Sequence, residues 1–110
     1  MAIPVRTPDI EAEIRFLTAQ EGGRSTPCLS GYRPNHDFGL NGMLNDATHQ
    51  YIGKESVAPG ETALAHIWFL VPDYQLGMLY EGFKFTVQEG NRIVGYGFIT
   101  KVLNNLLLKQ

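Results

Sequence analysis

The stretch from Glu21 to Pro34 limits most strongly which fold this chain can adopt. It lies between two runs of strand-like alternation and carries three glycines, two prolines and two arginines. Glycine permits positive φ and proline fixes φ, so the stretch dictates its own backbone course. Arg24 and Arg33 are therefore expected on a stiff loop, which suits recognition at low entropic cost. An equally weighted alternative is that each arginine bonds turn carbonyls or a nearby glutamate.

The segments around this stretch predict short strands. Residues 9–18 alternate apolar and polar side chains with a period of two, which is typical of a half-buried strand. A helix over 10–14 is the competing interpretation, because Asp9 can cap a helix and glutamate favours one. Further strands are expected at 32–38, 49–57 with a break at Gly53, 62–71, 82–88 and 92–103.

Turns are expected between these strands. Residues 39–48 are interpreted as a turn or loop, and as the most mobile part of the chain. Residues 58–61 and 89–91 predict tight turns, each with a glycine able to take positive φ. Gly95 and Gly97 share one face of their strand and allow close approach of another backbone. With no convincing helix, the sum predicts an all-β fold, a small antiparallel barrel or sandwich.

Size and composition indicate one domain over residues 1–110, with 1–8 as an irregular lead-in and 104–110 as a tail. Leu106, Leu107 and Leu108 are either docked or form an apolar patch that seeks a partner. The chain has 44% apolar and 18% charged residues and a net charge of −2, which argues against nucleic-acid or membrane binding through bulk electrostatics. No apolar run reaches membrane-spanning length, so a soluble cytoplasmic protein is expected.

Residues for catalysis or metal binding are sparse, and we expect no enzyme activity, no cofactor and no metal. His36 and Asp37 are the nearest approach to a metal pair, but adjacent strand residues point to opposite faces. Cys28 and His36 could be drawn as nucleophile and base, yet no third group orients them. His66 is expected to be a satisfied, buried or half-buried side chain.

Two multi-residue motifs resemble a known family. Glu21-Gly22-Gly23-Arg24, Thr26-Pro27 and Gly31-Tyr32-Arg33-Pro34 resemble the opening of the third, C-terminal β-barrel domain of bacterial elongation factor Tu. The segment 89–97, from Glu89-Gly90-Asn91-Arg92 to Gly97, resembles its closing motif. The likeness covers residues 8–104 and implies a six-stranded antiparallel closed barrel.

The resemblance also implies contacts. In the family this barrel packs on a GTPase domain and touches the T stem of tRNA and the nucleotide-exchange factor. Arg24, Arg33, Glu89 and Gly90 are the binding residues that it suggests. Ser25, Asn35 and Asn91 depart from the family pattern, so the core and turns match better than the RNA-facing edge. With no GTPase domain before it, the chain is expected neither to bind GTP nor to deliver tRNA alone.

Several functional interpretations remain open. The first is a stand-alone, non-catalytic module that binds a translation factor or another protein that binds elongation factor Tu, including a decoy or immunity role. The second is a tRNA- or RNA-binding domain that keeps the T-stem contact loops. A homo-oligomer formed through the face that docks on the GTPase domain in the family is a further interpretation.

Overall fold

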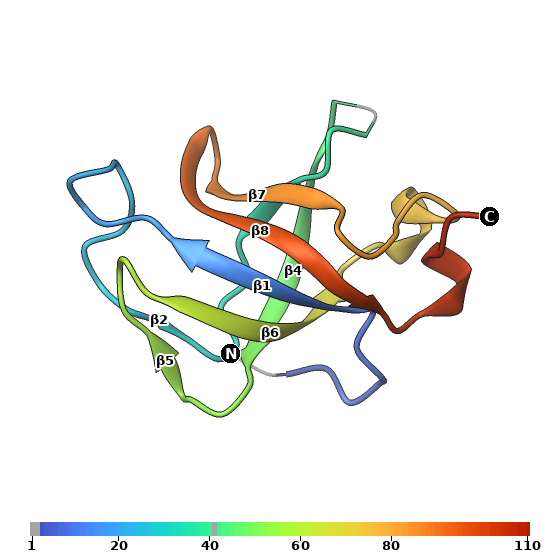
Figure 1. Cartoon of the computed structure of the whole chain (residues 1–110), viewed down its shortest axis with the longest axis horizontal. Coiled ribbons are helices and arrows are strands. Elements are labelled where there is room, and N and C mark those ends of the chain that lie inside the picture. The colour runs from blue at the N-terminus through green and yellow to red at the C-terminus, as the bar shows by residue number, and fades with distance from the viewer. Residues whose placement is uncertain (1–2, 41) are drawn as a thin grey trace.

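The computed structural model describes residues 3–40 and 42–110, and six of its strands form a closed barrel (Figure 1). Around the barrel the order is β1-β6-β4-β3-β7-β8, and every neighbouring pair is antiparallel, including β8 with β1. The bounds are β1 Ile10–Phe16, β2 Cys28–Leu29, β3 Asn35–Asp37, β4 Leu44–Tyr51, β5 Ser56–Val57, β6 Thr62–Phe69, β7 Lys84–Glu89 and β8 Arg92–Val102, with short 3₁₀ turns η1 Pro72–Gln75 and η2 Asn105–Leu107. Strands β2 and β5 pair separately.

The alternation in β1 sets its two faces, as predicted. Ile10, Ala12, Ile14 and Phe16 are buried in the barrel, while the residues between them face outward. The helical alternative over 10–14 is wrong, because β1 hydrogen-bonds to β6 on one side and β8 on the other. The expected close approach of another backbone occurs at both glycines, where a Cβ atom would lie 3.1 Å from the carbonyl oxygen of Arg15 at Gly95 and 3.2 Å from that of Glu13 at Gly97. At Gly97 the ring of Phe85 comes closer still, at 2.6 Å.

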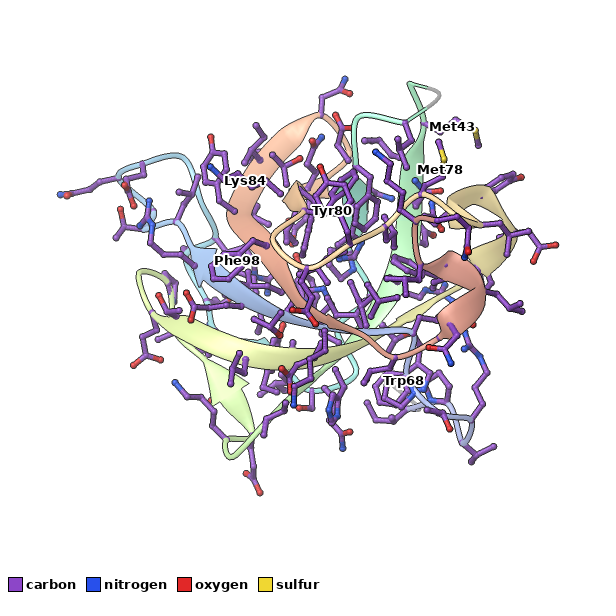
Figure 2. All side chains as sticks on the ribbon, turned by 45° about the vertical axis from the view of Figure 1, so that its right-hand side comes forward. Met43, Trp68, Met78, Tyr80, Lys84 and Phe98 are labelled. Carbon is purple, nitrogen blue, oxygen red and sulfur yellow. The ribbon has the colours of Figure 1, made fainter. Side chains whose placement is uncertain are left out.

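Strand β6 carries the most apolar run, and its two faces differ. The alanines and Ile67 on the inner face are buried. On the outer face Leu64 is 40% exposed, whereas Trp68 is buried and its Nε1 donates a hydrogen bond to the carbonyl oxygen of Arg6 at 2.6 Å. Figure 2 shows Trp68 next to the N-terminal lead-in. The lead-in therefore covers only one end of this outer face.

The interpretation of residues 39–48 as a loop is wrong for the second half of the segment. Strand β4 begins at Leu44 and lies between β3 and β6, so Leu44 to Thr48 belong to the barrel. Asn and Asp are depleted in strands, but pairing of Asn45 and Asp46 with β3, together with the hydrogen bond from the N–H of Leu70 to the carbonyl oxygen of Asp46 at 3.0 Å, outweighs their weak propensity. Asn41, also in this segment, lies outside the described residues.

Other expected strands have different bounds, including the one expected at 82–88, which is Lys84–Glu89 in the structure. The strand expected at 32–38 is confined to β3, and the one expected at 49–57 is divided between β4 and β5, with Gly53 in the intervening turn. The run 62–71 ends as a strand at Phe69, because Pro72 begins the turn η1. The turns at 58–61 and 89–91 lie where they were expected, and Gly60 and Gly90 have positive φ.

The strand register defines two ends of the barrel. Phe16 pairs with Gly95 near the end that carries the 18–27 loop and the β7–β8 hairpin, which we call the loop end. Ile10 pairs with Val102 and Ile67 at the opposite end, which we call the tail end because the C-terminal residues follow from it. In Figure 1 the loop end lies to the left and the tail end, with the C-terminus, to the right.

Candidate binding site at the loop end of the barrel

An ion pair joins two distant parts of the chain at the loop end. The guanidinium of Arg24, in the loop after β1, pairs with the carboxylate of Glu89, at the end of β7. The hydroxyl of Tyr32 donates to the same carboxylate oxygen at 2.6 Å. The ring of Tyr32 also lies against the arginine, with Cζ of Arg24 4.9 Å from the ring centroid. The three side chains thus form one contact group.

The loop that carries Arg24 is closed by its own side chains. The carboxylate of Glu21 accepts from the backbone N–H of Thr18 at 2.9 Å, and the hydroxyl of Thr18 accepts from the N–H of Glu21 at 3.2 Å. Arg15 contacts the same carboxylate at 3.2 Å and, with Thr18, lowers the pKa of Glu21 to about 2. The backbone before Arg24 is therefore fixed locally.

Arg24 is extensively engaged within the protein. Its Nη2 donates to Oγ1 of Thr26 at 3.1 Å, and its Nε donates to the carbonyl oxygen of Thr26 at 3.4 Å. For Arg24, the predicted alternative of bonding a turn carbonyl and a glutamate is thus confirmed.

The electrostatics of the group follow from partial burial and pairing. Partial burial raises the pKa of Glu89, but hydrogen bonds from Tyr32 and Arg24 outweigh it and hold that pKa below its ordinary value. Burial also raises the pKa of Tyr32, and the hydrogen bond to the Glu89 carboxylate raises it further. Arg92 adds a second cation, with Nη2 3.5 Å from Oε1 of Glu89. Two arginines and one glutamate leave this group with a net positive charge.

Gly90 lies beside this ion pair at the tip of the β7–β8 hairpin. It has φ of 62°, and its N–H donates to Oδ1 of Asn35 at 2.9 Å. The carbonyl oxygen of Gly90 accepts from Nε2 of Gln88 at 2.9 Å. The hairpin tip is thus fastened to the start of β3.

Arg33 lies between the two residues that contact this hairpin, Tyr32 and Asn35. It is exposed, and within residues 3–40 and 42–110 no carboxylate comes within ion-pairing distance of its guanidinium. A pocket of about 290 Å³ opens beside the group, lined by Arg24 and residues 27–32. The four residues singled out from the sequence thus lie on three segments that meet at the loop end.

Sequence reasoning did not anticipate the parts played by Tyr32 and Asn35. Tyr32 precedes Arg33 in a motif that was already noted, so its position was available, but its hydroxyl partner lies 57 residues away. Asn35 was noted only as a departure from the family pattern.

The barrel interior contains a polar chain that the sequence analysis also missed. Nδ1 of His36 lies 3.0 Å from the carbonyl oxygen of Asn45, Nε2 of His36 lies 2.7 Å from Nε2 of His49, and Nδ1 of His49 lies 3.0 Å from the hydroxyl of Tyr51. A carbonyl can only accept, so His36 donates from Nδ1 and, when neutral, accepts at Nε2. His49 then donates from Nε2 and accepts from Tyr51. Both rings are thus satisfied in the neutral form.

The residues weighed from the sequence for catalysis or metal binding, His36, Asp37 and Cys28, have defined surroundings in the fold. Burial lowers the pKa of His36 to about 4, and its ring is committed to Asn45 and His49. The thiol of Cys28 is buried, and burial raises its pKa to about 11. The raised pKa disfavours the thiolate form of Cys28, and the sequence had supplied no third group to orient a Cys28–His36 pair. Asp37 faces away from His36, which is buried, and the described residues contain no cluster of three metal-ligating side chains.

No helix in the described part of the chain has the length and apolar character needed to cross a bilayer. The family model described as the elongation factor Tu C-terminal domain matches residues 4–103, which is most of the chain. Domains of this family are non-catalytic barrels, and the closed six-stranded barrel agrees with that fold. On this match, the chain belongs to the elongation factor Tu C-terminal domain family.

Proposed function

We propose that this domain is a non-catalytic protein-binding module of the cytoplasmic translation machinery, and that its partner docks on the loop end through Arg24, Arg33, Glu89 and Gly90. The partner is a translation factor or another protein that binds elongation factor Tu, and a decoy or immunity role is one form of the same activity. Family membership supports a binding module linked to translation.

The observation that carries the proposal is the internal pairing of Arg24. A phosphate that approached this guanidinium would have to displace Glu89 or sit next to its carboxylate, whose side chain is 34% exposed. A protein partner meets a different surface, because a rigid pair offers both a donor and an acceptor for polar contacts. Aromatic and arginine side chains are also enriched among residues that dominate protein interfaces.

RNA binding is the second candidate, and Arg33 favours it. Arg33 is exposed and follows Tyr32, which belongs to a group with a net positive charge, so the loop end could contact a few phosphates. The net charge of −2 for the whole chain weighs against this function.

Affinity capture of the tagged protein from its native lysate tests both candidates. Capture is performed with and without ribonuclease, and at low and high salt. A protein partner is expected to survive ribonuclease, whereas RNA capture disappears with ribonuclease and weakens steeply with salt because phosphate contacts release counterions.

Three variants locate the contact. Arg33→Ala and the double variant Arg24→Ala with Glu89→Ala are expected to reduce capture. Lys101→Ala is the matched control, because it removes an exposed cation near the tail end, where Lys101 lies opposite Glu11 in the β1–β8 strand register. Equal loss in the control, or no loss in the other variants, would contradict docking at the loop end.

A further inference from the structure

The exposed apolar residues of this domain are concentrated at the tail end. Eight of the sixteen large apolar residues that the described chain exposes fall within two short segments, 70–80 and 106–108. They are Leu70, Val71, Tyr74, Leu76, Met78, Tyr80, Leu106 and Leu108, with exposed fractions between 39% and 72%. We call these eight residues the tail-end surface. Figure 2, which turns this side forward, shows Met78 and Tyr80 on the segment that connects β6 to β7.

Backbone hydrogen bonds hold the two segments together. The N–H of Leu79 donates to the carbonyl oxygen of Leu107 at 2.8 Å, and the N–H of Lys109 donates to that of Leu79 at 2.8 Å. Leu79 and Leu107 are fully buried, while their neighbours Met78, Tyr80, Leu106 and Leu108 are exposed. The docked tail therefore anchors inward at two leucines and presents apolar side chains outward. Of the two alternatives expected for the tail, docking describes Leu107 and an exposed apolar patch describes Leu106 and Leu108.

The tail-end surface carries very little charge. Asp73 is the only charged residue among the fourteen residues of segments 70–80 and 106–108. At its edge the ammonium of Lys109 lies 5.6 Å from the ring centroid of Tyr80. A surface with so few charges loses little solvation when another apolar surface covers it.

The exposed area is large enough for a stable contact between two proteins. With about 150–250 Å² for an aromatic residue and an area near the lower end of that range for Leu, Met and Val, the exposed fractions of the eight residues sum to roughly 700 Å² of mostly apolar surface. Apolar patches on monomeric proteins seldom exceed about 300–600 Å². Two such surfaces facing each other would bury roughly 1,400 Å², within the range of about 1,200–2,000 Å² for specific interfaces.

We propose that the tail-end surface is covered by the same surface of a second copy, which gives a two-fold symmetric dimer. A different partner would be selected mainly through complementary charge, and this surface offers only Asp73 for that purpose. A second copy presents the same apolar area and equally few charges, so two copies are complementary to each other in polarity without any further partner. The dimer leaves both loop ends free, so this inference does not depend on the proposed function.

Sedimentation velocity of the full chain over a wide concentration range tests the proposal. The mass is expected to approach twice the 12.3 kDa of one chain as concentration rises. Leu106→Lys introduces one charge into each half of the interface, and is expected to raise the dissociation constant of the dimer about 30-fold or more.

Leu29→Lys is the matched control, because Leu29 is 64% exposed and lies on β2, outside the tail-end surface. It is expected to leave the mass distribution unchanged. Far-ultraviolet circular dichroism checks folding, and Tyr74→Lys is the replacement if Leu106→Lys does not fold.

A wild-type protein that stays monomeric, or that binds only a different protein through these residues, overturns the proposal. Equal weakening by Leu29→Lys also overturns it. Capture at the loop end should be unchanged in Leu106→Lys, which separates this test from that of the proposed function.

Discussion

Gln75 shows what a single residue contributes to the stability of this barrel. It is fully buried at the end of η1, and among the described residues it is the only buried side chain with polar atoms that lack a hydrogen-bond partner. Both its Oε1 and its Nε2 are unpartnered. A buried polar group without a partner has lost its bonds to water and gained none, so it opposes folding.

Gln75→Met is therefore expected to stabilise the domain. Methionine has a similar length and no amide, so the substitution should raise the free energy of unfolding by about 1 kcal/mol. Urea denaturation measures the change. Gln88→Met is the matched control, because Gln88 is also buried but its Oε1 accepts from Thr86 at 2.7 Å and its Nε2 donates to Gly90 at 2.9 Å. That variant should be destabilised, and stabilisation of both variants would contradict the argument.

At the scale of an element, the β7–β8 hairpin depends on the backbone of Gly90. Its φ of 62° lies in the left-handed region, and no atom lies within 4 Å of the position that a Cβ would take. Backbone strain, without steric collision, should decide the effect of a substitution. Gly90→Val is expected to lower the free energy of unfolding by more than about 1 kcal/mol.

Gly90→Asn tests whether backbone strain, and not the mere replacement of glycine, causes the loss of stability. Asparagine tolerates the left-handed region better than branched residues do, so this variant should lose clearly less stability than Gly90→Val. Thermal unfolding of the two variants side by side measures the difference. An unchanged melting temperature in Gly90→Val would show that this hairpin does not require positive φ.

The elements also show how far the sequence predicts this fold. Strand β1 and the β7–β8 hairpin were predictable because alternation and a tight turn are local properties of the chain. Strand β4 was not, because Asn45 and Asp46 have weak strand propensity and the strand depends on pairing with β3 and β6. The amino-acid pattern alone left a barrel and a sandwich open, and the family resemblance selected the barrel.

The candidate site follows the same division. The stiff loop around Arg24 and the turn at Gly90 could be predicted from glycine and proline, and the family resemblance suggested the classes of partner that they would contact. The contact between Arg24 and Glu89 spans 65 residues, and the His36–His49 contact requires the register in which His36 pairs with Asn45. Such contacts depend on how distant strands align, which no short stretch of sequence specifies.

The whole molecule encloses two neutral histidines, and this should make its stability depend on pH. His36 and His49 are fully buried in the barrel, next to the aromatic rings of Phe38, Phe85 and Tyr51. Burial lowers the pKa of His36 from 6.5 to about 4, although Asn45 and Asp46 act in the opposite direction. Burial and the neighbouring ring of His36 also lower the pKa of His49 well below 6.5.

Stability should therefore fall as the pH falls below about 6.5. Below that pH the unfolded chain binds protons at both histidines while the folded barrel does not, so protonation favours the unfolded state. The stabilising contribution is fully present above the unfolded pKa and is lost as the pH falls toward the folded pKa. Each histidine contributes a slope of up to about 1.4 kcal/mol per pH unit, and the shift at His36 corresponds to about 3 kcal/mol in total.

Urea denaturation between pH 7 and about pH 5 measures this slope before most carboxylates titrate. His49→Gln is expected to lower stability at neutral pH, because the bond to His36 changes, and to reduce the slope by about half, because one buried titrating ring is gone. His66→Gln is the control, because His66 lies on the outward face of β6 and leaves the buried pair intact. A free energy of unfolding that stays constant between pH 6.5 and pH 5 would mean that the buried rings accept protons in the folded barrel. In the neutral chain one proton lies between the two Nε2 atoms, and a second proton there would leave two donors facing each other. Constant stability would therefore show that the Tyr51–His49–His36 chain does not keep both rings neutral.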